Sequence, residues 1–334
     1  MKTTAEKRYE AFPQEAQRPQ STQGKRVLER IPFGMQRKIV SHMTTKSWKE
    51  IPHTAYVYEP DVTDFFLQYK RMNALHTHGS GHAAHPKKIT FNTLMLRALT
   101  EGIKAAPRVN AHIRYDDRYV RGHIDVLENI DITMPWLLPN GEMMTVNMHD
   151  FGSKTLDEMT AYMARISEKI KQTDYNEAMY EVSLANTMEV LKQGRIGEPL
   201  RKLIGARFGD SKANTLRGKA KKAYHAIPES KRLTGHDLEP GTVTISNIGS
   251  LYREQRGYVA LLEIIPPQVF AIAIGAVQEK PLVVGSGANK RVEPRSVLPI
   301  CLAFDHRALD FGEVVPFIQR MDEIFAKPEV IHSW

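Results

Sequence analysis

The chain contains a single cysteine, Cys301, among its 334 residues. This excludes an intrachain disulfide and a cysteine metal cluster, so we expect the fold not to depend on oxidation state. The sequence also lacks a run of about 18 apolar residues that could span a membrane. Its first twenty residues contain no apolar segment typical of a secretory signal. We therefore expect no membrane span and a cytoplasmic location.

The charge is moderately basic, with 46 Lys and Arg against 38 Asp and Glu, a formal net charge of +8. Such a balance suits an anionic partner: nucleic acid, a membrane surface, an acidic carrier protein or a phosphorylated small molecule. Zinc-finger spacing, RNA-binding aromatic motifs and long basic runs are missing, so we expect no nucleic-acid partner. The hydrophobic content of 42% is sufficient for a substantial core.

The pattern along the chain predicts a polar, flexible arm at residues 1–28 and one folded domain at residues 29–334. Apolar residues at helical or alternating spacing indicate the elements of that domain. We expect helices starting near 31 and 63 and helices at 91–106, 156–170 and 314–325, with strands at 55–58, 120–138, 142–148, 242–248, 269–276 and 298–304. Residues 173–230 are rich in Lys and Arg and contain helical patches, which indicates a basic, largely helical insertion.

The string Asp305-His306-Arg307-Ala308-Leu309-Asp310 directly follows the last apolar strand. A histidine that leaves a sheet at this point can project into a cleft, and Asp310 is close enough to turn back toward it. An isolated H-x-x-x-D pattern also occurs in ordinary charged surface turns, so the string alone does not identify a site.

Five further blocks precede that string. They are Ile31-Pro32-Phe33-Gly34-Met35-Gln36-Arg37 with Met43; Ile51-Pro52-His53 with Asp61-Val62-Thr63; Ala105-Ala106-Pro107-Arg108-Val109-Asn110-Ala111; Gly241-Thr242-Val243-Thr244-Ile245-Ser246-Asn247-Ile248-Gly249; and Pro266-Pro267-Gln268 with Ile274-Gly275-Ala276. In this order the six blocks resemble the catalytic domain of the 2-oxoacid dehydrogenase acyltransferases, the E2 components, and through them chloramphenicol acetyltransferase. The resemblance covers about residues 30–172 and 230–330.

The resemblance implies an α/β fold, a two-layer sandwich with a mixed sheet flanked by helices, assembled as a homotrimer or a multiple of it. It implies acyl transfer between coenzyme A and an acceptor thiol, amine or hydroxyl, at a site shared by two subunits. His306 would take the proton from the acceptor, and Ser246 of the neighbouring subunit would stabilise the tetrahedral oxyanion. Asp310 would orient the histidine by pairing with an arginine. Judged from the residues alone, Thr242, Thr244 and Ser246 alternate along a strand and could instead simply face solvent or form local hydrogen bonds.

Two positions depart from the family pattern. Phe311 stands where glycine is usual after Asp310, and Gln36 stands where the first block usually has its arginine. Arg37, another arginine or no arginine could therefore be the partner of Asp310.

Two other features admit alternative interpretations. His76, His78, His82 and His85 could bind a transition metal, but the Gly and Ala between them are typical of a loop, and we expect no metal site. The basic residues between Gln193 and Lys222 could dock the phosphates of coenzyme A or an acidic carrier domain, but such runs usually face water.

Neither a lipoyl domain nor a subunit-binding domain is recognisable, so we expect no covalently bound lipoyl group here. The protein would then either work with a lipoyl or other acyl-carrier domain supplied in trans or acylate something else. Two alternatives to an acyltransferase remain: a noncatalytic trimeric scaffold, and a basic module that binds a carrier protein or nucleic acid.

Overall fold

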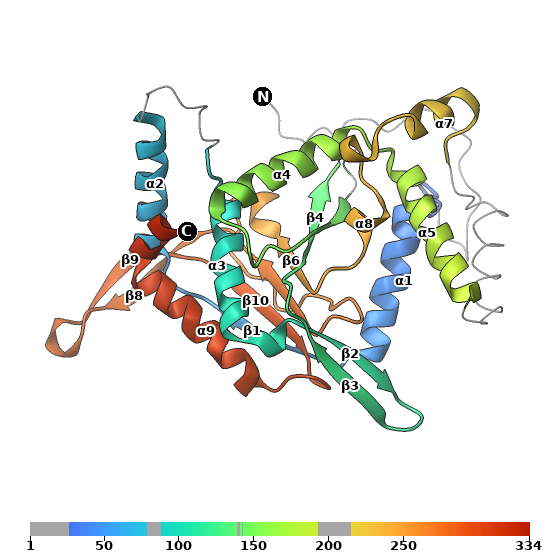
Figure 1. Ribbon diagram of the computed structural model, residues 1–334. Helices are drawn as coiled ribbons and strands as arrows, with labels where there is room; N and C mark the ends of the chain where they lie inside the picture. The colour runs from blue at the N-terminus through green and yellow to red at the C-terminus, as the bar shows by residue number, and fades with distance from the viewer. Residues whose placement is uncertain (1–26, 79–87, 139–140, 142, 193–214) are drawn as a thin grey trace.

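The computed structural model describes residues 27–78, 88–138, 141, 143–192 and 215–334 (Figure 1). The predicted arm at residues 1–28 lies almost entirely outside these residues, as do His82 and His85.

A six-stranded mixed sheet forms the centre of the molecule, in the order β1-β10-β7-β6-β4-β5. Strands β4, β6 and β7 run parallel to one another, and the other neighbouring pairs are antiparallel. The strands are β1 (His53–Tyr58), β4 (Ile132–Leu137), β5 (Met143–Met148), β6 (Val243–Asn247), β7 (Phe270–Ile274) and β10 (Ile300–Asp305). Both β7 and β10 are buried along their whole length, as expected for central strands.

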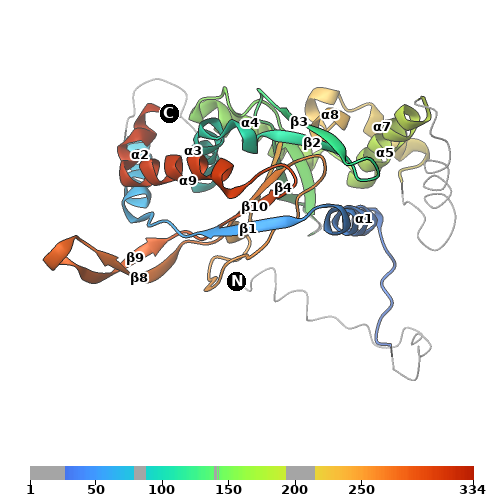
Figure 2. The ribbon, with the colours of Figure 1, turned by 90° about the horizontal axis from the view of Figure 1, so that it is seen from below.

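Helices cover one face of this sheet, as Figure 2 shows for α2, α3, α4 and α9. The helices are α1 (Met35–Glu50), α2 (Thr63–His78), α3 (Phe91–Ala105), α4 (Leu156–Lys171), α5 (Tyr175–Lys192), α7 (Gly218–His225), α8 (Gly235–Leu238) and α9 (Phe311–Ala326). The predicted mixed sheet flanked by helices is thus confirmed. None of the described helices is long and apolar enough to cross a membrane.

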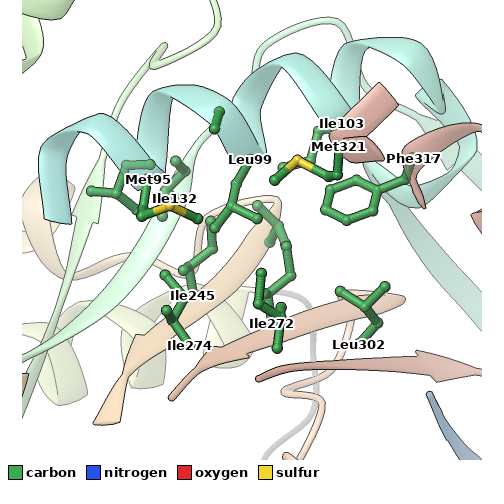
Figure 3. Close-up of a cluster of buried hydrophobic side chains, with 14 of the residues drawn as sticks. Met95, Leu99, Ile103, Ile132, Ile245, Ile272, Ile274, Leu302, Phe317 and Met321 are labelled. Atoms are coloured by element: carbon green, nitrogen blue, oxygen red, sulfur yellow. The ribbon is translucent and has the colours of Figure 1, made fainter. Parts of the chain in front are cut away.

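The main core lies between the sheet and helices α3 and α9. α3 begins at Thr90, whose hydroxyl accepts the N–H of Thr93 at 3.1 Å, and ends before Pro107. Figure 3 shows the apolar faces of both helices meeting side chains from four strands. The labelled residues are Met95, Leu99, Ile103, Ile132, Ile245, Ile272, Ile274, Leu302, Phe317 and Met321. Burial of these side chains, each worth about 1.5–3 kcal/mol, holds the helix layer on the sheet.

Two hairpins project from opposite ends of the body (Figure 1). The first consists of β2 (Ala111–Asp116) and β3 (Arg121–Val126), and the second of β8 (Gln278–Val284) and β9 (Arg291–Val297). The second hairpin turns between Val284 and Arg291, where Gly285 and Gly287 have φ of 85° and 55°. The predicted strand at 120–138 is wrong as a single element, because β3 and β4 within it belong to different sheets.

Candidate functional site

The last central strand, β10, ends in a tight turn that carries His306. The carbonyl oxygen of Asp305 accepts hydrogen bonds from the N–H groups of Ala308 and Leu309, both at 3.0 Å. The N–H of His306 donates to the carbonyl oxygen of Pro52 at 3.1 Å. The turn is therefore fixed both internally and to the chain leading into the edge strand β1.

A buried ion pair lies beneath this turn. The Asp305 side chain is fully buried, and both of its carboxylate oxygens accept from the Arg307 guanidinium, at 3.0 and 3.2 Å from Nε and 2.7 Å from Nη2. The backbone N–H of Arg307 also donates to this carboxylate at 3.0 Å. Hydrogen bonding to Asp305 raises the pKa of the Arg307 guanidinium. This pair, which holds the two residues that flank the histidine, was not predicted from the sequence.

His306 itself presents one ring nitrogen to the protein and leaves the other open. Nδ1 lies 3.2 Å from the carbonyl oxygen of Leu309 and 3.3 Å from Oδ1 of Asp310. Both of these groups accept hydrogen bonds, so they favour the tautomer with the proton on Nδ1. The side chain is 53% exposed, and Nε2 has no partner among the described residues. In the neutral ring Nε2 therefore carries a free lone pair directed away from the turn's hydrogen bonds.

Asp310 begins helix α9 immediately after the turn. Its backbone N–H donates to the carboxylate of Glu313 at 2.6 Å, an interaction that lowers the pKa of Glu313. The Asp310 side chain is 84% exposed and lies beside His306. An arginine partner was one expectation for this carboxylate, but none of the described arginines pairs with it. The carboxylate–arginine pair that fixes this turn is Asp305 with Arg307.

The two departures from the family pattern are accommodated without disturbing the turn. The ring of Phe311 packs on Tyr56 of β1, with ring centroids 5.1 Å apart. The Gln36 amide donates to the carbonyl oxygen of Met143 at 2.6 Å, which ties α1 to β5. Both residues therefore make structural contacts of their own.

A second histidine near the turn, His53, differs from His306 in its hydrogen bonding. Its Nδ1 lies 2.8 Å from the carbonyl oxygen of Ile51, and its Nε2 accepts the N–H of Ile264 at 3.1 Å. Both ring nitrogens are engaged with the backbone, so His53 holds the structure and has no lone pair to offer a substrate.

Ser246 lies near the end of β6, on the sheet face opposite the helices. Val243 and Ile245 of the same strand point into the helix-covered core, so Thr242, Thr244 and Ser246 alternate with them on the other face. The two threonines are buried. The hydroxyl of Thr242 donates to the carbonyl oxygen of Asp131 at 3.1 Å, and the hydroxyl of Thr244 donates to Oε1 of Gln268 at 2.6 Å. Of the two alternatives for this row, solvent exposure does not hold for the threonines, which are hydrogen-bonded, and Ser246 is half-buried.

One chain does not bring Ser246 and His306 together. Ser246 pairs with Ala273 of β7, which pairs with Cys301 of β10. Asp305 is four residues further along β10, toward the opposite end of the strands. At about 3.3 Å per residue and 4.8 Å per strand spacing, the Cα atoms of Ser246 and Asp305 are about 16 Å apart. His306 follows Asp305, away from Ser246, so the two residues lie near opposite ends of the sheet's central strands.

A surface pocket of about 780 Å³ lies away from both residues, between α4 and residues 230–237. Its lining includes Tyr162, Arg165, Lys169 and Asp237, with Lys169 and Asp237 paired at 3.0 Å. None of its lining residues comes from the strands that carry Ser246 or His306, so this hollow does not form part of that site.

Metal ligation finds little support in the described residues. Of the predicted histidine cluster, His82 and His85 lie outside them, and so do the side chains of His76 and His78. Another group, Glu177, Glu181 and His225, brings its ligand atoms within 4.8 Å of one another.

Cations already balance the charges of this second group. Nζ of Lys221 lies 2.7 Å from the Glu177 carboxylate, and Nη1 of Arg232 lies 3.2 Å from the Glu181 carboxylate. Burial would raise the pKa of Glu177, but hydrogen bonds from Lys221 and His225 outweigh it and lower that pKa. The group is a salt-bridge network that holds α7 against α5.

Comparison with known proteins agrees with this architecture. The family described as 2-oxoacid dehydrogenases acyltransferase (catalytic domain) matches residues 26–183 and 217–333. The chain is 24% identical over 306 residues to the lipoamide acyltransferase component of a branched-chain α-keto acid dehydrogenase complex from Pseudomonas aeruginosa, covering 90% of this chain and 52% of that protein. It is 22% identical over 300 residues to a pyruvate dehydrogenase acetyltransferase component from Haemophilus influenzae, covering 90% and 40%. The chain thus spans about half the length of these relatives.

Among solved structures, the cubic core of a pyruvate dehydrogenase multienzyme complex superposes with a TM-score of 0.61 at 17% identity, covering 96% of this chain and 99% of that one. Dihydrolipoamide acetyltransferase from Azotobacter vinelandii gives the same values. These similarities establish a shared fold, and the family match extends over most of the chain. The chain belongs to the family of 2-oxoacid dehydrogenase acyltransferase catalytic domains.

Proposed function

We propose that this protein transfers an acyl group between coenzyme A and an acceptor thiol, with Nε2 of His306 as the general base. The observation that carries the proposal is the hydrogen bonding of the ring. Nδ1 faces two acceptors, the Leu309 carbonyl oxygen and the Asp310 carboxylate, while Nε2 has no partner among the described residues and the side chain is 53% exposed. A neutral imidazole held in this tautomer can act as a general base, which typically contributes about 100- to 10,000-fold to a rate.

The transfer would proceed through a tetrahedral intermediate. The acceptor thiol gives its proton to Nε2 of His306 as its sulfur bonds to the thioester carbonyl carbon, and the carbonyl oxygen becomes an oxyanion. Collapse of the intermediate breaks the bond to the coenzyme A sulfur, which takes the proton back from Nε2. The Asp310 carboxylate, 3.3 Å from Nδ1, would stabilise the imidazolium between these steps. Asp310 is thus proposed as a positioning residue that carries no proton.

Ser246 of a second copy would complete this site. Within one chain Ser246 and the His306 turn lie near opposite ends of the central strands, about 16 Å apart at the backbone. A hydroxyl that stabilises the oxyanion must lie about 3 Å from it, so only another subunit's Ser246 could serve. We therefore propose a homotrimer or a multiple of it, with each site shared between neighbours.

The proposed acceptor is a dihydrolipoyl thiol carried on a separate domain. The similar proteins are named as a lipoamide acyltransferase and dihydrolipoyllysine-residue acetyltransferases, which motivates this choice over a small amine or alcohol. The Azotobacter vinelandii structure comes from a study of the catalytic roles of a serine, a histidine and an asparagine. In that protein the asparagine is four positions after the histidine. Asp310 has the same spacing from His306 here.

Cys301 is a buried free thiol, which suits the cytoplasm as the proposed location.

The test is the release of free coenzyme A from acetyl-CoA in the presence of dihydrolipoamide. We expect His306→Ala to lower kcat by at least about a hundredfold with the melting temperature unchanged, because the ring is exposed and contributes little packing. We expect Ser246→Ala to lower kcat by roughly 100- to 1,000-fold. His123→Ala is a matched control, because His123 is 61% exposed on β3 and should leave kcat unchanged. A His306→Ala protein as active as the parent would refute the proposed role.

A further inference from the structure

The Arg307 side chain, next to the proposed base, is held from two directions. Its guanidinium bonds to the buried carboxylate of Asp305 through Nε and Nη2. Its Cζ also lies 5.5 Å from the ring centroid of Tyr115, on β2. A guanidinium within about 6 Å of an aromatic ring centroid can form a favourable cation–π contact. The tyrosine therefore adds a second restraint on an arginine that pairs with a single carboxylate among the described residues.

Tyr115 is placed there by a firmly attached part of the first hairpin. The N–H of Ile113 donates to the carbonyl oxygen of Pro267 at 2.9 Å, and His112 forms an isolated bridge with Gln268. Beyond this attachment the hairpin projects away from the body, and β3 is exposed along its whole length. Tyr115, two residues past Ile113, is thus close enough to the anchored base to hold a fixed position.

We propose that Tyr115 is a positioning residue for His306, which rests on the function proposed above. A chain of contacts joins the two. The ring holds the Arg307 guanidinium on the Asp305 carboxylate, and the carbonyl oxygen of Asp305 accepts the N–H of Leu309 at 3.0 Å. The carbonyl oxygen of Leu309 in turn faces Nδ1 of His306 at 3.2 Å. Tyr115 thereby stabilises the orientation and the tautomer that leave Nε2 available.

The hairpin supplies a matched control for this contact. Tyr119, near the hairpin tip, is 68% exposed, and the Cζ of Arg121 lies over its ring, 5.7 Å from the ring centroid. It makes the same kind of contact on the same element, away from the turn. Tyr119→Leu therefore tests whether damage to the hairpin itself affects the reaction.

Three variants would be compared by steady-state kinetics. We expect Tyr115→Leu to lower kcat by about three- to tenfold, the size of one partly exposed cation–π contact, with KM for acetyl-CoA nearly unchanged. Tyr115→Phe keeps the ring and should stay within about twofold of the parent. Tyr119→Leu should equal the parent. A normal Tyr115→Leu enzyme would overturn the proposal, and so would equal losses in both leucine variants.

A double-mutant cycle and a spectroscopic signature separate positioning from general weakening. If Tyr115 acts through Arg307, the losses from Tyr115→Leu and Arg307→Lys should not add in the double variant, whereas full additivity would contradict this route. The ¹⁵N signals of the His306 ring should report protonated Nδ1 in the parent and in Tyr115→Phe, and a mixture of tautomers in Tyr115→Leu. This signature is independent of turnover. An unchanged ring spectrum would therefore refute the positioning, while full activity of His306→Ala would refute the proposed function alone.

Discussion

Replacing Arg307 by methionine should strongly destabilise the protein, because it leaves the Asp305 carboxylate buried without a cation. Asp305 is fully buried, while the Arg307 side chain is 22% exposed. The substitution removes the guanidinium contacts at 2.7, 3.0 and 3.2 Å and leaves the backbone N–H of Arg307 as the remaining donor from that residue. Breaking a buried, hydrogen-bonded ion pair from one side costs about 3–5 kcal/mol.

The measurement is the free energy of unfolding from urea denaturation at one fixed protein concentration, because an oligomer's stability depends on concentration. Arg307→Lys retains the positive charge but loses the bidentate hydrogen bonding to the carboxylate. We therefore expect it to lower the free energy of unfolding by less than Arg307→Met does. The double variant Asp305→Asn with Arg307→Met removes both charges, and it should recover part of the stability lost in Arg307→Met. A loss below about 1 kcal/mol for Arg307→Met would show that the pair does not hold the turn.

Two further predictions concern other groups. Bonding to Asp131 raises the pKa of His149, so its stabilising contribution should be fully present below the unfolded-state pKa and lost as the pH rises through the higher folded-state pKa. The stability difference between the parent and His149→Gln should therefore be larger at pH about 5.5 than at pH about 8.5, and a difference independent of pH would contradict this. Burial raises the pKa of Cys301 to about 11, so iodoacetamide at pH about 8 should label the folded protein at least about a hundredfold more slowly than the urea-unfolded chain. Equal labelling rates would show that the thiol is accessible.

The central elements of the fold could be predicted from the sequence because their apolar residues are periodic and locally bounded. Helix α3 illustrates this, since Thr90 caps it and Pro107 follows its end. Strand β2 was missed because only Ala111 is buried in it and its other five residues are partly or fully exposed, so no alternation marks it. The single strand expected at 120–138 failed for a different reason. The break between β3 and β4 is set by Asn110, which donates to the carbonyl oxygens of Leu127 and Asn129 from a distant part of the chain.

The candidate site was only partly accessible to sequence reasoning. The position of His306 at a strand end could be predicted, and the structure adds the tautomer, which depends on the Leu309 carbonyl and the Asp310 carboxylate. The Asp305 and Arg307 pair was missed because a spacing of two residues reveals neither burial nor side-chain direction. The contact between Arg307 and Tyr115 joins segments 192 residues apart in number, and no local pattern indicates it. Residues 193–214, which include most of the predicted basic stretch, lie outside the described chain.

The central claim is that His306 of one subunit and Ser246 of another form one site, and subunit mixing tests it most directly. His306→Ala and Ser246→Ala proteins, each inactive alone, are unfolded, mixed in equal amounts and refolded together. If subunits associate without preference, about a quarter of shared sites will combine an intact His306 with an intact Ser246. The mixture should then regain about a quarter of the parent's coenzyme A release per site. Background activity in verified mixed oligomers would contradict the shared site.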